Sequence, residues 1–439
     1  MAKRTRRQKA IIRRRIFFTV VAAILIGLIA LIGFIISSIF GTQDNKPQND
    51  SSITESVASV EEKETFATVL STGDIMVHDT QVYGAYNSQT GEYDFSAFFK
   101  ETASYFKSAD LSVANLEVTF GGTESGKYSG YPAFNTPDSL ADAIKNSGLN
   151  FLITANNHSY DTGLFGLKRT AQILKQKGIE FIGTRETTDD NTYAIKAING
   201  IKIGMANYTY STFANGKKAL NGNVLKEEAG PLVNTFDYNN IESFYTEAQS
   251  VISEMKHNGA EFIVFYMHWG NEYQLKANTW QKSIAQKLSN LGVDIIIGSH
   301  PHVIEPIELI HSEDGQNTTV CVYSTGNVVS NQRQEIMDSC PSGHTEDGML
   351  FSFTLRKYKN EVSLDSVDLI PTWVNRYKGG GGYLYTIYPL ENADWGSTKY
   401  SLDATAANKA LKSYERTKAI VAEGLTEVQK HIGCEITFK

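Results

Sequence analysis

The stretch Ile295-Ile-Ile-Gly-Ser-His-Pro-His302 joins an apolar run to two histidines that are separated by one residue. The run is short and rich in β-branched side chains, which favours a buried strand over a helix. On an extended backbone, side chains at positions i and i+2 point to the same side. We therefore expect His300 and His302 to bind one metal ion, or two neighbouring ions, where this strand ends.

Short apolar runs of the same kind alternate with helix-like stretches over the body of the chain. Strands are predicted at 66–70, 111–116, 149–154, 262–267 and 293–298, and helices at 137–147, 163–177, 238–256 and 278–290. This alternation predicts a layered α/β domain. A second sheet, and hence a β-sandwich flanked by helices, is expected from the runs 201–208, 318–323, 349–355 and 362–369. One closing helix, or a pair of helices, is predicted over 404–431.

Residues able to bind metal follow each of the first five strands. In open α/β sheets, ligands bind beyond the carboxyl ends of the strands, so these side chains are expected to meet. A single Asp or His at a strand end is more often a cap than a ligand, but five such ends in succession favour a site. The set is Asp74, His78, Asn115, Glu117, Asn157, His158, Asp161, His268, Glu272, His300 and His302.

The residue types in this set indicate the metal and the chemistry. Imidazole, carboxylate and amide ligands suit Mn, Fe or Zn, and they outnumber what one tetrahedral ion needs, so two divalent ions are expected. Two such ions activate a bridging water and stabilise charge on a phosphoryl oxygen. His158 is the candidate that stays off the metals and protonates the leaving oxygen.

Charge and cysteine content exclude other classes of protein. Residues 1–15 hold eight Lys/Arg and no acid, so of 41 basic residues 33 remain against 48 acidic ones, a formal charge of −15 for the rest of the chain. A body this acidic is a poor binder of nucleic acid. Three cysteines without CxxC spacing exclude a zinc ribbon. Buried thiols are preferred here over one disulfide and one free thiol.

The N-terminal region predicts a membrane protein. Residues 16–40 are 25 residues without a charge, long enough as a helix of about 37 Å to cross a bilayer. A cleavable signal peptide is the alternative, but its cleavage site is missing. The basic flank places residues 1–15 in the cytoplasm and the body outside the cell. Residues 41–65 are polar and predict a flexible stalk.

Six motifs in order resemble the CapA family of capsule and poly-γ-glutamate biosynthesis proteins, itself similar to calcineurin-like metallophosphoesterases. They are Gly73-Asp74-Ile-Met, Asn115-Leu-Glu117, Asn156-Asn157-His158, His268-Trp-Gly, Gly298-Ser-His300-Pro-His302 and Tyr323-Ser-Thr-Gly-Asn327. The resemblance implies a metallophosphoesterase-like domain over 66–375, followed by a C-terminal extension, 376–439, that packs on it.

The resemblance also implies roles for individual residues. Asp74 and His302 are expected on one metal, Glu117 as the bridging acid, and Asn157, His268 and His300 on the second metal. His158 is the unliganded acid. The superfamily usually opens with Asp-x-His, whereas here the nearest histidine, His78, stands four positions after Asp74, and Asn-Leu-Glu replaces a Gly-Asp-x-x-Asp.

Further positions are candidates for contacts around this centre. Asp161 and Glu272 are expected to orient metal ligands without contacting the metal themselves. For Glu272, an exposed acid in a loop is an equally favoured alternative. Asn135, Asn327 and Arg333 are candidate substrate contacts. For Arg333 a solvated surface arginine is the preferred alternative.

Two functions follow from these observations. The resemblance implies a membrane-anchored extracellular protein that makes or exports capsule polymer, working with the membrane subunits of a poly-γ-glutamate synthase. The residues favour a metal-dependent hydrolase acting on a phosphoester or an anionic cell-envelope polymer. A scaffolding module ranks last, because it leaves the histidines unexplained.

Overall fold

The computed structural model describes residues 63–379, 381–391, 399–435 and 438. The predicted tail and membrane anchor, and nearly all of the predicted stalk, lie outside these residues. Within the described ranges, no helix is both long enough and apolar enough to cross a membrane. The elements below all belong to one unit, residues 62–439.

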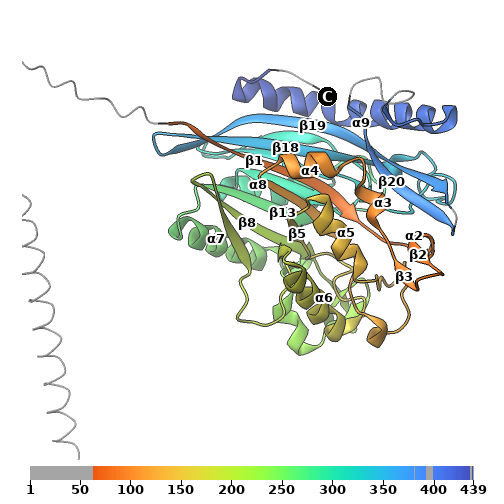
Figure 1. Ribbon diagram of the computed structural model, residues 1–439. Coiled ribbons are helices and arrows are strands. Elements are labelled where there is room, and N and C mark those ends of the chain that lie inside the picture. Colours follow the sequence, from red (N-terminus) through yellow and green to blue (C-terminus); the bar gives the residue numbers. More distant parts are fainter. Residues whose placement is uncertain (1–62, 380, 392–398, 436–437, 439) are drawn as a thin grey trace, which may run out of the picture. The chain divides into compact units, whose positions relative to one another are not determined.

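Two β-sheets pack face to face in this unit (Figure 1). The first has the order β20-β19-β18-β1-β4-β5-β6, with β17 also paired to β1. Its strands are β1 (Thr65–Ile75), β4 (Leu111–Leu116), β5 (Phe151–Ile153), β6 (Glu180–Ile182), β17 (Asn327–Val329), β18 (Asp347–Tyr358), β19 (Glu361–Lys378) and β20 (Tyr383–Pro389).

The second sheet has the order β12-β8-β13-β14-β16-β15, with β7 paired to β8. Its strands are β7 (Tyr193–Ile198), β8 (Ile201–Tyr210), β12 (Thr235–Phe236), β13 (Phe262–His268), β14 (Ile295–Ser299), β15 (Ile307–His311) and β16 (Thr318–Val322). A small separate sheet, β9 (Thr212–Ala214), β10 (Lys217–Leu220) and β11 (Asn223–Val224), follows β8.

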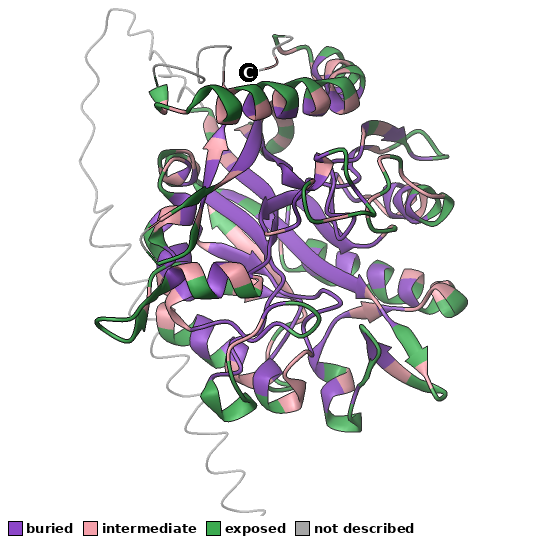
Figure 2. Cartoon of the chain, turned by 90° about the vertical axis from the view of Figure 1, so that its right-hand side faces the viewer, coloured by how far each residue is buried: buried purple, intermediate pink, exposed green. Residues whose placement is uncertain are grey.

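The main core lies between the two sheets. Val69 and Val113 contribute from the first sheet, and Val264 and Ile295 from the second. Fully buried β-branched side chains on both inner faces explain why these runs form strands. Figure 2 shows the strands buried in the interior, while the helices around them keep exposed outer faces.

Helices cover the outer faces of both sheets. Against the first sheet pack α3 (Ser96–Phe99), α4 (Ala103–Ser108), α5 (Ser139–Ser147) and α6 (Gly163–Lys177). The second is covered by α7 (Ile241–His257) and α8 (Thr279–Asn290). Their apolar residues recur on one side of each helix, as amphipathic helices require.

The last helix, α9 (Ala404–Ile432), packs mainly on β19 of the first sheet and β15 of the second, and it also contacts β18. Its Val421, Leu425 and Val428 extend the core between the sheets. A Cβ added at Gly424 would lie 1.8 Å from the carbonyl oxygen of Ile307, so glycine permits this close approach. A single helix therefore occupies the stretch 404–431 for which one helix or a pair was predicted.

The mixed α/β architecture was predicted correctly, but the assignment of strands to the second sheet was wrong. Of the four runs assigned to it, β8 and β16 do join β13 and β14, whereas β18 and β19 extend the first sheet from β1. β18 pairs antiparallel with β1, which lies almost 300 residues earlier. The apolar pattern of a run predicts that the strand is buried, but it does not predict which other strand it pairs with.

Candidate metal centre

The ends of four parallel strands bring the candidate ligands together. Asp74 lies near the end of β1, where it is paired in register with Asn115 of β4. His268 ends β13, in register with Ser299 of β14. β1 and β4 belong to the first sheet and β13 and β14 to the second, so the cluster forms where the carboxyl ends of both sheets converge.

Two overlapping groups of three could each hold a metal ion. One is Glu117, His300 and His302, the other is Asp74, Glu117 and His268, and the ligand atoms within each lie within 4.8 Å of one another. All five side chains are buried. Glu117 is common to both groups, which is the position that a bridging carboxylate requires.

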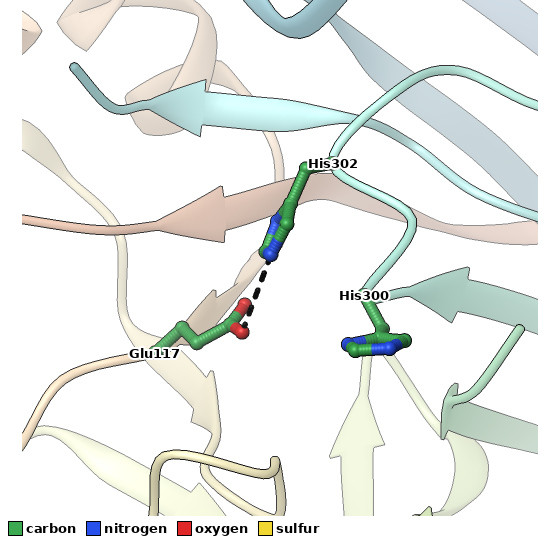
Figure 3. Close-up of side chains that lie close together, drawn as sticks. All are labelled: Glu117, His300 and His302. Atoms are coloured by element: carbon green, nitrogen blue, oxygen red, sulfur yellow. Dashed lines mark ion pairs between the residues drawn. The ribbon is translucent and has the colours of Figure 1, made fainter. Parts of the chain in front are cut away.

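Single distances define the arrangement further. His302 places Nδ1 3.1 Å from Asp74 Oδ2 and Nε2 3.9 Å from Glu117 Oε1, and Figure 3 shows the imidazole pointing at the Glu117 carboxylate. His268 Nε2 lies 3.5 Å from Glu117 Oε1 and 2.8 Å from Asn157 Oδ1. The two groups combine His300 with His302, and Asp74 with His268. The resemblance had instead implied Asp74 with His302, and His268 with His300.

The backbone that carries His300 and His302 is not extended. The strand ends at Ser299, and both histidines have positive φ, 96° and 57°. Such conformations of residues other than glycine are strained by about 1–3 kcal/mol each and cluster at functional sites. The two rings lie 5.8 Å apart at 59°. The expected same-side geometry on a strand was therefore wrong, because the pair lies on a strained turn.

The turn is fixed by hydrogen bonds from neighbouring segments. Tyr273 N donates to the carbonyl of Pro301 at 2.8 Å, and Asn327 Nδ2 donates to the carbonyl of His302 at 3.2 Å. His300 N donates to Asp74 Oδ2 at 3.3 Å. These bonds hold both imidazoles in place and compensate for the unfavourable φ values.

The electrostatic properties of the centre favour the binding of cations. Burial, with the nearby carboxylate of Asp74 adding to it, raises the pKa of Glu117 well above its usual range. Burial and the other imidazoles hold the pKa of His268 and of His300 well below the usual range. Glu117 Oε1 and His300 Nδ1 are buried without a hydrogen-bond partner. Neutral imidazoles and partnerless acceptor atoms are what a divalent cation needs, so these residues fit one.

His158 lies outside both groups and is held by Asp161. Its Nδ1 lies 2.7 Å from Asp161 Oδ2, an oxygen that also accepts from Phe134 N at 2.8 Å. The ring of Phe134 packs edge-on against His158 at 4.7 Å. Asp161 therefore holds the His158 ring in one orientation through its Nδ1 atom.

His78 and Glu272 belong to the surroundings of the centre. His78 Nδ1 accepts from Asn331 N at 3.2 Å, and burial lowers the pKa of His78 to about 4. His78 is in neither group of three. Glu272 is exposed in a loop that also lines a pocket with His300, and its charge contributes to the raised pKa of Glu117.

The three candidate substrate contacts have contacts within the protein. Asn135 Nδ2 donates to the carbonyl of Gly122 at 2.9 Å and so holds a loop. Asn327 supports the His302 turn. Arg333 is only 2% exposed and pairs with Glu346 at 2.7 Å. The surface alternative for Arg333 was therefore wrong, because the guanidinium has a buried carboxylate as its partner.

Sequence reasoning did not identify several supporting residues. Asn156 Nδ2 donates to Asn115 Oδ1 at 3.1 Å, and Asn115 Nδ2 in turn donates to Asp74 and Glu117 at 2.8 and 3.1 Å. Tyr210, at the end of β8, lies 4.9 Å from the ring of His300. Its position after a buried strand was the available signal. Ser299 Oγ, 3.0 Å from His268 Nδ1, directly follows the predicted strand 293–298 and carried the same signal.

Comparisons with known proteins agree with the resemblance. The family described as bacterial capsule synthesis protein PGA_cap matches residues 68–332. The capsule biosynthesis protein CapA of Bacillus anthracis is 27% identical over 325 residues, 72% of this chain and 70% of that protein. The PGA biosynthesis protein CapA of Bacillus subtilis is 28% identical over 289 residues, 65% of this chain and 67% of that protein.

Among solved structures, the calcineurin-like phosphoesterase YfkN of Bacillus subtilis aligns with 81% of this chain and 98% of its own, at 16% identity and a TM-score of 0.37. The protein TT1561 of Thermus thermophilus aligns with 65% of this chain and 94% of its own, at 10% identity and a TM-score of 0.30. These scores are too low to add to the argument from geometry. The family match covers more than half of the sequence, and the chain belongs to the bacterial capsule synthesis protein PGA_cap family.

Proposed function

We propose that this protein acts at the outer face of the cell membrane in making or exporting a capsule polymer of the poly-γ-glutamate type, with a metal-dependent hydrolytic centre. The observation that carries the proposal is the position of Glu117, which is shared by two groups of buried ligands. The His158–Asp161 pair is separate from both groups. Relatives named for capsule and PGA biosynthesis support the biological role.

In this proposal, Asp74, Glu117, Asn157, His268, His300 and His302 hold two divalent ions of the Mn, Fe or Zn class. The bound ions supply positive charge for a phosphoryl oxygen and lower the pKa of a water. His158, oriented by Asp161, gives a proton to the leaving oxygen. In hydrolysis the water loses a proton to solvent as its oxygen bonds to phosphorus, and the bond from phosphorus to the leaving oxygen breaks. That oxygen takes the proton of His158 and leaves as the alcohol, and His158 regains a proton from solvent.

The proposed location rests on the sequence of residues 1–40. The basic segment 1–15 and the uncharged segment 16–40 support a single-pass anchor with the body outside. A protein held there meets polymer as it leaves the membrane. Membrane subunits of a polymer synthase are the proposed partners.

A second candidate function is polymer binding without bond cleavage. The names of the two Bacillus relatives describe biosynthesis and not hydrolysis, which favours an accessory role. In that case the ions would bridge the protein to anionic groups of the polymer. The same ligands serve either function, so turnover is the measurement that separates them.

The test uses the full-length chain in detergent, purified without chelator and supplied with manganese. Metal content is measured together with the turnover of bis(p-nitrophenyl) phosphate, and His158→Gln is the control that retains the ligands. We expect about two ions per chain and turnover that His158→Gln lowers by about 10²–10⁴-fold. Bound metal without turnover of any phosphoester would favour the accessory role. Protein without metal would contradict the assignment of the site.

A further inference from the structure

A pocket of about 570 Å³ is lined in part by His300. The other walls come from the segment after β8, from residues 237–239 and from the loop 270–272. His300 is only 4% exposed, and its Nδ1 has no hydrogen-bond partner. A larger cavity of about 790 Å³ lies at the strands β6 and β7 and contains none of the candidate ligands. The pocket at His300 therefore borders the candidate metal centre through one of its ligands.

Aromatic rings form much of this pocket. The Tyr210 ring lies 4.9 Å from His300 and 6.2 Å from Tyr238. Trp280 is not among the lining residues, but its ring lies 5.3 Å from Tyr238 and it is 43% exposed. Phe213, on the small sheet, also lines the pocket and is 51% exposed. Aromatic faces attract cations, and most strongly where water is excluded.

The charged side chains of the pocket are carboxylates. Asp237 and Glu272 line it, and no Lys or Arg stands among its described lining residues. Asp237 also accepts from Asn239 N at 2.8 Å, which fixes its position. The charge of Glu272 raises the pKa of Tyr210, in addition to the larger effect of burial. These carboxylates would repel an anionic group of a ligand in this pocket and attract a cationic group.

We propose that this pocket binds an ammonium group of the substrate while a phosphoester of the same molecule occupies the metal centre. The position of the phosphoester rests on the proposed function, but the ammonium pocket stands on its own lining residues. The ligand class is therefore a phosphoester with an amine or quaternary ammonium substituent.

Binding is measured by titration calorimetry on the full-length, manganese-loaded chain in detergent. The probes are inorganic phosphate, phosphocholine, phosphoethanolamine, phosphoglycolate and glucose 6-phosphate. We expect one or both ammonium compounds to bind about tenfold more tightly than phosphate, as one desolvated cation–aromatic contact provides. If phosphocholine alone binds more tightly than phosphate, the pocket is specific for a quaternary ammonium group. If phosphocholine and phosphoethanolamine bind equally well, the pocket accepts any ammonium group. Phosphoglycolate should bind more weakly than phosphate.

Glu272→Gln should reduce the ratio between the affinities for phosphocholine and phosphate to near one. Glu242→Gln, which makes the same charge change outside the pocket, should leave that ratio unchanged. Equal affinities for phosphocholine and phosphate, or a preference for phosphoglycolate or glucose 6-phosphate, would overturn the proposal. If none of the phosphates binds, the proposed centre is wrong, and titration with choline chloride tests the pocket separately. Absence of choline binding in that titration would overturn the pocket as well.

Discussion

His302 Nδ1 lies 3.1 Å from Asp74 Oδ2, although 228 residues separate the two in the chain. Asp74 belongs to β1 of the first sheet, and His302 follows β14 of the second. The contact therefore joins the two sheets at their carboxyl ends. The other ring nitrogen of His302 faces Glu117, so the imidazole stands between two buried carboxylates.

His302→Ala should lower the metal content of the chain, because it removes a ligand between Asp74 and Glu117. We expect the loss of about one ion per chain and of all phosphodiester turnover, with little change in the circular dichroism spectrum. Elemental analysis by mass spectrometry measures the metal. His311→Ala, an exposed histidine outside the cluster, is the matched control. Full metal content in the His302 variant would remove this residue from the ligand set.

Glu117→Gln should have opposite effects on the metal-free and the metal-loaded protein. Without metal, Glu117 and Asp74 are two buried acids bridged by one Asn115 amide, and the raised pKa of Glu117 means that burying this carboxyl group costs stability. The neutral amide of glutamine avoids this cost, so the Tm should rise. With metal, a bridging ligand is lost. Metal at a hundred times its Kd stabilises the wild type by about 2.7 kcal/mol, and this gain should disappear in the variant. Thermal denaturation with EDTA or with manganese compares the two states. A variant that metal still stabilises fully would show that Glu117 is not a ligand.

Asp161→Asn should lower kcat because Asp161 fixes the orientation of His158. General acid catalysis contributes about 10²–10⁴-fold, and we expect a loss in this range with the metal content preserved. His158→Gln should show a similar loss, and the double variant should lose little more, because the two residues act as a unit. Additive losses would indicate that Asp161 acts independently of His158.

The sequence predicted which residues meet but not how their backbone is arranged. Strand ends from Asp74 to His302 carry the ligand types, and neighbouring parallel strands bring such ends to one edge within each sheet. That the edges of two sheets converge on the cluster was not contained in these local patterns. The strained turn at His300 and His302 depends on bonds from Tyr273 and Asn327, which are distant in the chain. The burial of Arg333 depends likewise on Glu346, and the pairing of β18 with β1 joins segments that lie far apart in the sequence. None of these three features can be recognised from the residues that are close to it in the sequence.

Glu305 should make the stability of the protein fall as the pH rises. It is buried, accepts from Gln281 Nε2 at 2.6 Å, and burial raises its pKa to about 8. Between about pH 4.5 and pH 8 the folded state therefore retains a proton that the unfolded state releases. The free energy of unfolding should decrease by up to about 1.4 kcal/mol per pH unit across this range from this group.

Glu305→Gln should remove this contribution and leave a flatter profile, with the largest gain in stability at pH 8. Urea denaturation at pH 5, 6.5 and 8 measures it, and Glu313→Gln, an exposed acid, is the control. Parallel pH profiles for the wild type and Glu305→Gln would contradict the raised pKa.

Arg333 and Glu346 form a buried ion pair whose separation should be strongly destabilising. Arg333 Nη2 lies 2.7 Å from Glu346 Oε2, the same oxygen that accepts from Trp373 Nε1 at 3.1 Å, and both charged side chains are 2% exposed. Arg333→Met leaves the carboxylate buried without its cation, so the free energy of unfolding should drop by about 3–5 kcal/mol. Adding Glu346→Gln keeps an acceptor for Trp373 and should restore much of the loss. A variant with unchanged stability but a higher KM for the phosphodiester would instead identify Arg333 as a substrate contact.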